Sequence, residues 1–263
     1  MDHPSSEKPI IALGSWLATP PGSYVHAWEQ ARLNALTADI FGFNAVQVGL
    51  PQLDALQANR MPNRWLSATH LPPMAPADGR RVVVTHDVSE LPFASQSLDL
   101  VVLPHVLEFA AEPHQVLREV ERVLIPEGQV IVCGFNPASL WGLRQITARV
   151  SGHHFLPQNG EFIHLLRLKD WLKLLNMEVN RGHFGCYAPP CRSEKWLGRF
   201  DFMEKAGDRW WPYFGAVYIV QAVKRVQGMR LIGPAWSARM ARTQHAVPAT
   251  HSVHHTHHQN EHG

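Results

Sequence analysis

Residues that can bind a ligand or move a proton follow five apolar segments of the sequence. These residues are Gly49 and Leu50, Thr69 and His70, His86 and Asp87, Pro104 and His105, and Gly134 to Asn136. Histidine exchanges protons near neutral pH, and glycine lets a ligand approach the backbone closely. In an open α/β sheet, ligands bind outside the carboxyl ends of the strands. If the apolar segments are strands of one such sheet, these residues are the candidates for binding and catalysis.

Three other groups of residues are weaker candidates. His183, Cys186 and Cys191 have a spacing that a metal tolerates, but they offer only three ligands and two prolines separate the cysteines. A plain loop is favoured there, and we predict no metal site. The histidine-rich end of the chain would bind metals only incidentally. Trp210, Trp211 and Tyr213 could form the wall of an apolar substrate pocket, although a core or hinge role is favoured for them.

The overall composition excludes several classes of protein. Lys+Arg 24 against Asp+Glu 22 gives a net charge of +2, so there is no strong attraction to nucleic acid or to anionic membranes. No apolar run reaches the about 18 residues that span a bilayer, and the first residues lack the pattern of a secretion signal. Three cysteines do not make a disulfide framework. We expect a cytoplasmic protein that binds neither nucleic acid nor membranes.

The hydrophobic pattern predicts an alternation of strands and helices. Strands are predicted at 45–50, 64–69, 81–86, 98–105 and 128–135. Helices are predicted at 24–42, 51–60, 113–124, around 136–150, and at 167–177. A closing pair of strands, which we expect to be antiparallel, lies at 177–188 and 215–225. Such an alternation is typical of an α/β sheet with right-handed crossovers. We predict a flexible arm at 1–10, one domain at 11–236 and a disordered, histidine-rich tail at 237–263.

The segment 113–124 gives the strongest helix prediction. Pro113 suits the first helical position, because that position needs no backbone donor. Val116, Leu117 and Val120 belong to one apolar stripe, and charged residues occupy the other side. By the same argument about its first position, Pro51 is expected to open the short helix that follows the first strand.

The stretch 82–135 contains an ordered series of short motifs. Asp87 follows the third strand and precedes a Leu-Pro-Phe turn, and Ser-Leu-Asp then opens the fourth strand. His-Val-Leu-Glu follows that strand, and the next helix ends in Leu-Ile-Pro-Glu-Gly. In this order, the stretch resembles the second half of a class I S-adenosylmethionine-dependent methyltransferase of the type 11 branch, which methylates small molecules. The flanks, such as WLATPPGSYVHAWEQ and GFNPASLWGLR, resemble a poorly characterised bacterial subgroup of that branch.

The resemblance implies a fold and a cofactor. The fold would be a Rossmann-like seven-stranded mixed sheet, in the order 3-2-1-4-5-7-6, with the last strand antiparallel and helices on both faces. The cofactor would be S-adenosyl-L-methionine. The resemblance covers roughly residues 15–236, and no single motif within it is diagnostic on its own.

The resemblance also assigns roles to individual residues. Gly49 and Leu50 fall in the cofactor turn, where a bare backbone lies against the methionine part. Asp87 would accept a hydrogen bond from the adenine amine, and Val88 would supply a backbone donor and apolar cover. His105 would line the pocket near the methyl group, and it is the nearest candidate for a catalytic base. From residue type alone, Asp87 can equally cap its own turn and His105 can be a solvated residue with no further task.

Two further acidic residues lie in the same stretch. Asp99, at the start of the fourth strand, is expected to be structural, because a carboxylate at that place can bind a loop amide. Glu108 lies on the turn after the fourth strand. Its residue type does not decide between a structural and a functional role.

Three features depart from the pattern of the family. The first turn has one glycine where three are usual, and Leu50 and Pro51 would crowd the amino-acid end of the cofactor and remove one amide donor. The second strand ends without the carboxylate that usually binds both ribose hydroxyls, and the next acidic residue is Asp78. The helix between the second and third strands is missing. Loss of the ribose contact costs about 1.5–3 kcal/mol, which weakens binding roughly tenfold to a hundredfold.

These observations predict an S-adenosylmethionine-dependent methyltransferase that acts on an unidentified small molecule, as a monomer or homodimer. The alternative is a non-catalytic binding or scaffold protein with a methyltransferase fold and an eroded cofactor site. An NAD-dependent oxidoreductase is disfavoured, because dinucleotide binding needs the same missing glycines and carboxylate.

Overall fold

The structure is a computed structural model, and it describes residues 13–68, 81–84, 87–151, 155–156, 160–200 and 202–226. The chain divides into two compact units, residues 1–226 and 227–263, and every described residue belongs to the first. The predicted arm and tail therefore lie outside the described residues, as do Thr69, His70, Asp78 and His86. The predicted domain boundaries stay predictions.

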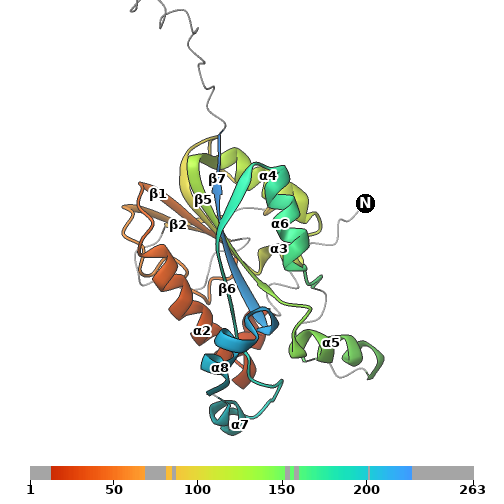
Figure 1. Ribbon diagram of the computed structural model, residues 1–263. Helices are drawn as coiled ribbons and strands as arrows, with labels where there is room; N and C mark the ends of the chain where they lie inside the picture. Colours follow the sequence, from red (N-terminus) through yellow and green to blue (C-terminus); the bar gives the residue numbers. More distant parts are fainter. Residues whose placement is uncertain are drawn as a thin grey trace, which may run out of the picture. The chain divides into compact units, whose positions relative to one another are not determined.

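Seven strands form one sheet in the order β3-β2-β1-β4-β5-β7-β6. Figure 1 shows this sheet in the middle of the molecule, with β1, β2, β5, β6 and β7 labelled. Their bounds are β1 Asn44–Val48, β2 Asn63–Ala68, β3 Arg81–Val84, β4 Leu98–Pro104, β5 Leu124–Phe135, β6 Met177–Gly185 and β7 Val217–Lys224. Neighbouring strands from β3 to β5 are parallel, and β7 is antiparallel to both β5 and β6. This confirms the predicted Rossmann-like sheet, including its strand order and the reversal of its last strand.

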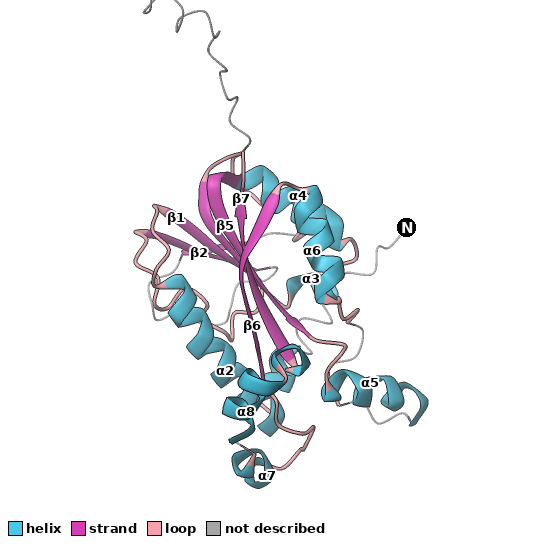
Figure 2. Ribbon diagram, viewed as in Figure 1, coloured by secondary structure: helices cyan, strands magenta, loops and turns pink. Residues whose placement is uncertain are grey.

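Helices cover both faces of the sheet (Figure 2). Their bounds are α2 Pro20–Thr37, α3 Val106–Phe109, α4 Pro113–Val123, α5 Leu140–Ser151, α6 Leu165–Leu174, α7 Glu194–Arg199 and α8 Phe202–Trp210, followed by the 3₁₀ turn η1 Pro212–Phe214. None of these helices is long and apolar enough to cross a bilayer, within the part of the chain that the structure describes. The predictions of helices at 113–124, 136–150 and 167–177 are confirmed.

The hydrophobic core is divided into two clusters by the sheet. Leu100 of β4 packs in the cluster that contains Leu33 of α2, whereas the next residue, Val101, packs in the cluster that contains Val120 of α4 and Leu168 of α6. Side chains of a strand alternate between the two faces, so a strand buried on both faces reads as a continuous apolar run. This explains the sequence LDLVVLP of β4.

Helix α2 begins earlier than the sequence predicts, at Pro20 instead of residue 24. The Thr19 side chain caps it by accepting a hydrogen bond from the Gly22 N–H, at 3.3 Å. Two prolines occupy the first helical positions, where no backbone donor is required. The proline pair therefore starts this helix, and the stretch WLATPPG contains a helix start rather than only a break.

The predicted helix at 51–60 is wrong. The backbone from Pro51 to Gln57 forms a series of turns. Side chains of β1 and α2 bind its carbonyl and amide groups, which an α-helix would need for its own hydrogen bonds.

Candidate functional site

The turns after β1 and β4 lie at the carboxyl edge of the sheet, and each is tied to a neighbouring strand. The Gly49 N–H donates to the Ser67 carbonyl of β2 at 2.7 Å, and the His105 N–H donates to the Cys133 carbonyl of β5 at 3.0 Å. A β-carbon added at Gly49 would meet, among the described residues, only the Val106 side chain, at 3.4 Å. The turns that carry Gly49 and His105 therefore lie next to each other, as expected for strands β1 and β4.

The side chain of Gln47 organises the first turn, a role that was not predicted from the sequence. Gln47 is fully buried, and its Nε2 donates to the carbonyls of Gly49, Leu50 and Leu53 at 3.2, 3.0 and 2.7 Å. Its Oε1 accepts from the Ala55 N–H at 2.9 Å. A glutamine that forms several bonds within one loop fixes the path of that loop.

Helix α2 holds the second half of the same loop. The Gln30 side chain donates to the Asp54 carbonyl at 2.6 Å and accepts from the Asp54 N–H at 3.1 Å. The His26 ring contacts the Gln52 carbonyl at 3.1 Å. Because these side chains already bind the loop backbone, the loop keeps its turns and does not wind into a helix.

Gly49 and Leu50 both have left-handed backbones, with φ of 69° and 43°. Glycine adopts this conformation freely, whereas leucine does so only under strain. The Leu50 side chain is 1% exposed and packs in the core cluster on the α2 face. The Leu50 backbone, and not its side chain, can therefore face a ligand. The predicted role of Leu50 in cofactor binding stays a prediction, and it concerns the backbone alone.

Asp87 and Val88 form the turn that follows β3. The Asp87 side chain is exposed, and its carboxylate accepts from the Ser89 N–H at 2.9 Å. Val88 is buried in the cluster that also contains Val48 and Val106, which flank the first and fourth strand ends. Asp87 therefore caps its own turn, while its exposed side chain remains accessible to an adenine amine. Both predicted cofactor roles remain untested.

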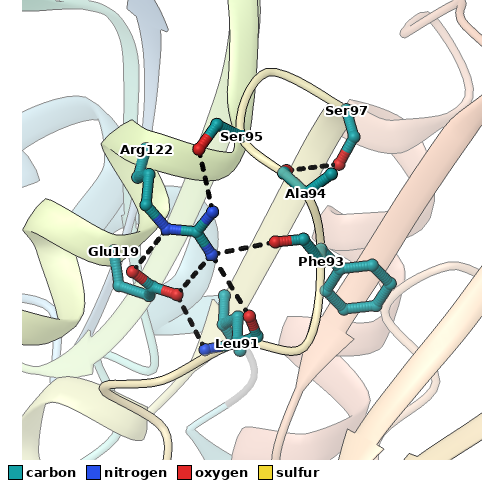
Figure 3. A network of polar contacts seen from close by, with 7 residues as sticks. All are labelled: Leu91, Phe93, Ala94, Ser95, Ser97, Glu119 and Arg122. Carbon is teal, nitrogen blue, oxygen red and sulfur yellow. Dashed lines mark hydrogen bonds and ion pairs between the residues drawn. The ribbon is translucent and has the colours of Figure 1, made fainter.

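The Leu-Pro-Phe turn after these residues is held by α4 (Figure 3). Arg122 donates to the carbonyls of Leu91 and Phe93 at 3.2 and 2.9 Å and to the Ser95 hydroxyl at 3.0 Å. Glu119 accepts from Arg122 and from the Leu91 N–H, at 2.9 Å for the latter. The hydrogen bond to Arg122 is the main cause that holds the pKa of Glu119 below its usual value. This pair fixes the loop that carries Asp87.

His105 lies in a left-handed turn with φ of 55° and is fully buried. Its ring contacts two carboxylates, Nε2 with Glu29 Oε1 and Nδ1 with Glu108 Oε2, each at 2.8 Å. Burial by itself lowers the pKa of His105, but the two negative charges outweigh burial and raise it to about 10. The ring is therefore protonated at neutral pH, and both of its N–H groups donate. Its predicted role as a base stays a prediction and requires the loss of one partner.

Glu108 and Glu29 complete this cluster. Glu108 also accepts a hydrogen bond from the Phe135 N–H at the end of β5. Glu108 therefore has a structural role, and a functional role beside it stays a prediction. Burial is the largest influence on the carboxyl group of Glu108 and raises its pKa. Glu29 was not predicted as a site residue, although the sequence contains an indication of its role. Glu29 lies between Val25 and Leu33 at helical spacing, so it is an acidic residue within the apolar stripe of α2.

The remaining candidates lie apart from this cluster. Asp99 accepts from the N–H groups of Phe43 and Asn44 at 3.0 and 2.9 Å, which confirms its predicted structural role. Within the described residues, no group of three or more His, Cys, Asp or Glu side chains could hold a metal ion. Trp210 and Tyr213 are 67% and 68% exposed, so the core role predicted for the segment 210–213 is wrong.

The geometry around Gly49 fits S-adenosylmethionine in part. The backbone at Gly49 is bare, and two buried polar atoms near the strand ends, Ser67 Oγ and Glu29 Oε2, have no hydrogen-bond partner among the described residues. Buried groups of this kind are rare unless a ligand, ion or water completes them. The position after β2, where a ribose-binding acid is usual, lies outside the described residues.

Comparisons with known proteins found a family match and a sequence relative. The family described as "Methyltransferase domain" matches residues 67–132. A protein of Escherichia coli (strain K12), named "Uncharacterized protein YafS", is 32% identical over 170 residues, which are 65% of this chain and 67% of that protein.

Two solved structures share the fold. The S-adenosylmethionine-dependent methyltransferase of Thermotoga maritima superposes with a TM-score of 0.57 at 16% identity, over 77% of this chain and 92% of that one. The S-adenosylmethionine-dependent methyltransferase of Archaeoglobus fulgidus gives a TM-score of 0.50 at 17% identity, over 76% and 94%. The family match, the Escherichia coli relative, the ordered motifs and the strand order together support one assignment. The chain belongs to the class I S-adenosylmethionine-dependent methyltransferases, in the type 11 branch.

Proposed function

We propose that this methyltransferase uses S-adenosylmethionine to methylate a small organic molecule. The observation that carries the proposal is the juxtaposition of Gly49 and the His105 turn at the carboxyl edge of a sheet with methyltransferase topology. When bound, S-adenosylmethionine supplies an activated methyl group, so the protein needs mainly to orient an acceptor and exclude water. Gly49 and the Leu50 backbone would lie against its methionine part, and Asp87 with Val88 would hold its adenine.

The fixed turns support this positioning role. Gln47 holds the first turn and Arg122 holds the loop that carries Asp87, so neither loop depends on the ligand for its shape. Preorganised loops lose less conformational entropy when a ligand binds. This rigidity partly compensates for the contacts that the single-glycine turn lacks.

A second candidate function is favoured by specific contacts. Leu50 is packed into the core, and both ring nitrogens of His105 are occupied by carboxylates. In a protein that binds without catalysis, these contacts would be permanent. That protein would retain the methyltransferase fold as a binding or scaffold module and would not bind the cofactor.

Calorimetry with S-adenosylhomocysteine separates the two candidates. For the enzyme we expect micromolar affinity in the wild type and a loss of about tenfold or more in Asp87→Ala, the loss of one charge-assisted hydrogen bond. Asp39→Ala, which changes an exposed aspartate, should bind like the wild type. An absence of heat at millimolar ligand would favour the scaffold.

The setting of the protein is part of the proposal. We place it in the cytoplasm, as a monomer or homodimer whose partner is a small-molecule substrate and neither nucleic acid nor a membrane. The near-neutral net charge of +2 supports this choice, because it provides no large field of one sign.

A further inference from the structure

Three buried side chains form a charged cluster between α2 and the ends of β4 and β5. Glu29 comes from α2, His105 from the turn after β4, and Glu108 from α3. Their exposed fractions are 0%, 0% and 3%. The His105 ring lies between the two carboxylates, with Nε2 2.8 Å from Glu29 Oε1 and Nδ1 2.8 Å from Glu108 Oε2.

The carboxylate oxygens of the cluster differ in whether they accept a hydrogen bond. Both oxygens of Glu108 accept hydrogen bonds, one from His105 and one from the Phe135 N–H. Glu29 Oε1 accepts from His105, but Glu29 Oε2 is buried and has no partner among the described residues. A buried carboxylate oxygen without a donor is costly, so its retention indicates that a donor from outside the described residues completes it.

The cluster lies beside the first turn of the sheet. Val106, the residue after His105, is the side chain that a β-carbon at Gly49 would touch at 3.4 Å. Gln47, the buried polar side chain nearest in sequence to Gly49, has its amide bonded to the loop backbone. Two buried polar atoms near the strand ends lack a partner among the described residues, the Ser67 hydroxyl oxygen and Glu29 Oε2. Glu29 Oε2 is the one that belongs to a carboxylate, so Glu29 is the candidate acceptor for a charged donor on a ligand that lies along Gly49.

The chemistry of the free atom selects the kind of ligand. A buried carboxylate oxygen that lacks a donor favours a cation that carries N–H donors, because hydrogen bonds between charged groups are the strongest. A metal ion is disfavoured, because both ring nitrogens of His105 already contact carboxylates and are not available as ligands. An ammonium group supplies both a positive charge and the missing hydrogen bond.

We propose that Glu29 binds the α-ammonium group at the methionine end of S-adenosylmethionine through its Oε2 atom. This inference rests on the proposed function, since it takes the methionine part to lie along Gly49. His105 fixes the other oxygen of Glu29, and Phe135 packs on the His105 ring with centroids 4.4 Å apart. Helix α2 thereby contributes a ligand-binding carboxylate to a site that is otherwise built by loops at strand ends.

The test compares two ligands that differ in the amino-acid end. S-adenosylhomocysteine carries the α-ammonium group, and 5′-methylthioadenosine lacks the whole amino-acid part. Binding of each is measured by calorimetry to the wild type, to Glu29→Gln and to Glu112→Gln, a matched change at an exposed glutamate. We expect Glu29→Gln to weaken S-adenosylhomocysteine at least tenfold and to change 5′-methylthioadenosine by less than twofold. Glu112→Gln should leave both affinities unchanged.

Other outcomes separate this inference from the proposed function. Equal losses for the two ligands in Glu29→Gln, or no loss for either, overturn the role of Glu29. Failure of the wild type to bind either ligand overturns the proposed function instead. If Glu29→Gln does not fold, Glu29→Asp keeps the charge with a shorter reach, and the same difference between the ligands is expected. Equal affinity of the wild type for S-adenosylhomocysteine and its desamino analogue overturns the inference without any variant.

Discussion

At the scale of single residues, Gln47 decides the shape of the cofactor turn. A family turn with several glycines lets the backbone bend freely, whereas this turn has one glycine and a leucine in the left-handed region. The four hydrogen bonds of the Gln47 side chain compensate for the strain at Leu50. The buried polar side chain of Gln47, inside an apolar strand, thus stabilises this turn although the turn has fewer glycines.

Replacing Gln47 with leucine tests that role. Gln47→Leu keeps the volume but leaves three carbonyls and one amide of the loop without partners, so we expect the free energy of unfolding to fall by about 2–4 kcal/mol. S-adenosylhomocysteine binding should weaken as well, since the turn loses its fixed path. Gln115→Leu, a change of an exposed glutamine on α4, should shift stability by no more than about 0.5 kcal/mol. Urea unfolding that gives equal values for the two variants would contradict this account.

The charged cluster makes stability depend on pH in a predictable direction. The pKa of His105 is raised from 6.5 to about 10, so the folded protein holds a proton that the unfolded chain releases. Its contribution is complete below the unfolded pKa and is lost as the pH rises from about 6.5 to about 10. In that window the free energy of unfolding should fall by about 1.4 kcal/mol per pH unit from this group.

Urea unfolding at several pH values between 6 and 9.5 measures this slope. His105→Gln cannot hold the proton, so its stability, although lower overall, should depend less steeply on pH than that of the wild type. The difference between the two curves isolates His105 from the other histidines. Parallel curves across this range would show that the two carboxylates do not hold a proton on the ring.

At the scale of elements, the approach to β1 is fixed by β4. Gly42 lies against Asp99, and a β-carbon at residue 42 would be 2.5 Å from the Asp99 β-carbon. Asp99 in turn binds the two amides that lead into β1. The glycine is therefore required by close packing, and the register of β1 beside β4 depends on it.

Gly42→Ala should displace Asp99 and cost about 2 kcal/mol, through the loss of hydrogen bonds to a charged group. For a chain of this size that loss lowers Tm by roughly 4–8 °C. Gly182→Ala in β6 is a matched control, because its β-carbon would meet no atom within 4 Å. Thermal unfolding should show Gly182→Ala near the wild-type Tm or above it, since glycine is unfavourable in strands. A similar decrease in both variants would contradict the packing explanation.

The sequence predicted the elements whose signals are local. The buried runs of β1, β4 and β5 and the amphipathic α4 need only periodicity and a proline at the helix start. The segment 51–60 was wrongly predicted to be a helix, because its structure depends on Gln30 and Gln47, which lie in other elements. Asp99 was predicted from its place at a strand start. Glu29 was not predicted, because its partner His105 lies 76 residues away and only the fold brings them together.

At the scale of the whole molecule, the sheet separates a protected centre from an edge. β4 lies between β1 and β5 and is buried on both faces, whereas β6 pairs, within the described residues, with β7 alone. Glu178 and Arg181 of β6 are exposed, and charged residues on an edge strand discourage pairing with another chain. Of the two predicted oligomeric states, we therefore expect the monomer, and this stays a prediction.

Hydrogen exchange tests this arrangement, because amides open with free energies that depend on their place in the fold. We expect the amides of β4 and β5 to exchange only by global unfolding, and those of β6 that face away from β7 to exchange orders of magnitude faster. A ligand at the carboxyl edge should slow exchange in the turns after β1 and β4 and leave β6 unchanged. If β6 is instead as protected as β4, and its protection falls on dilution, a second copy covers this edge and the homodimer is the correct state.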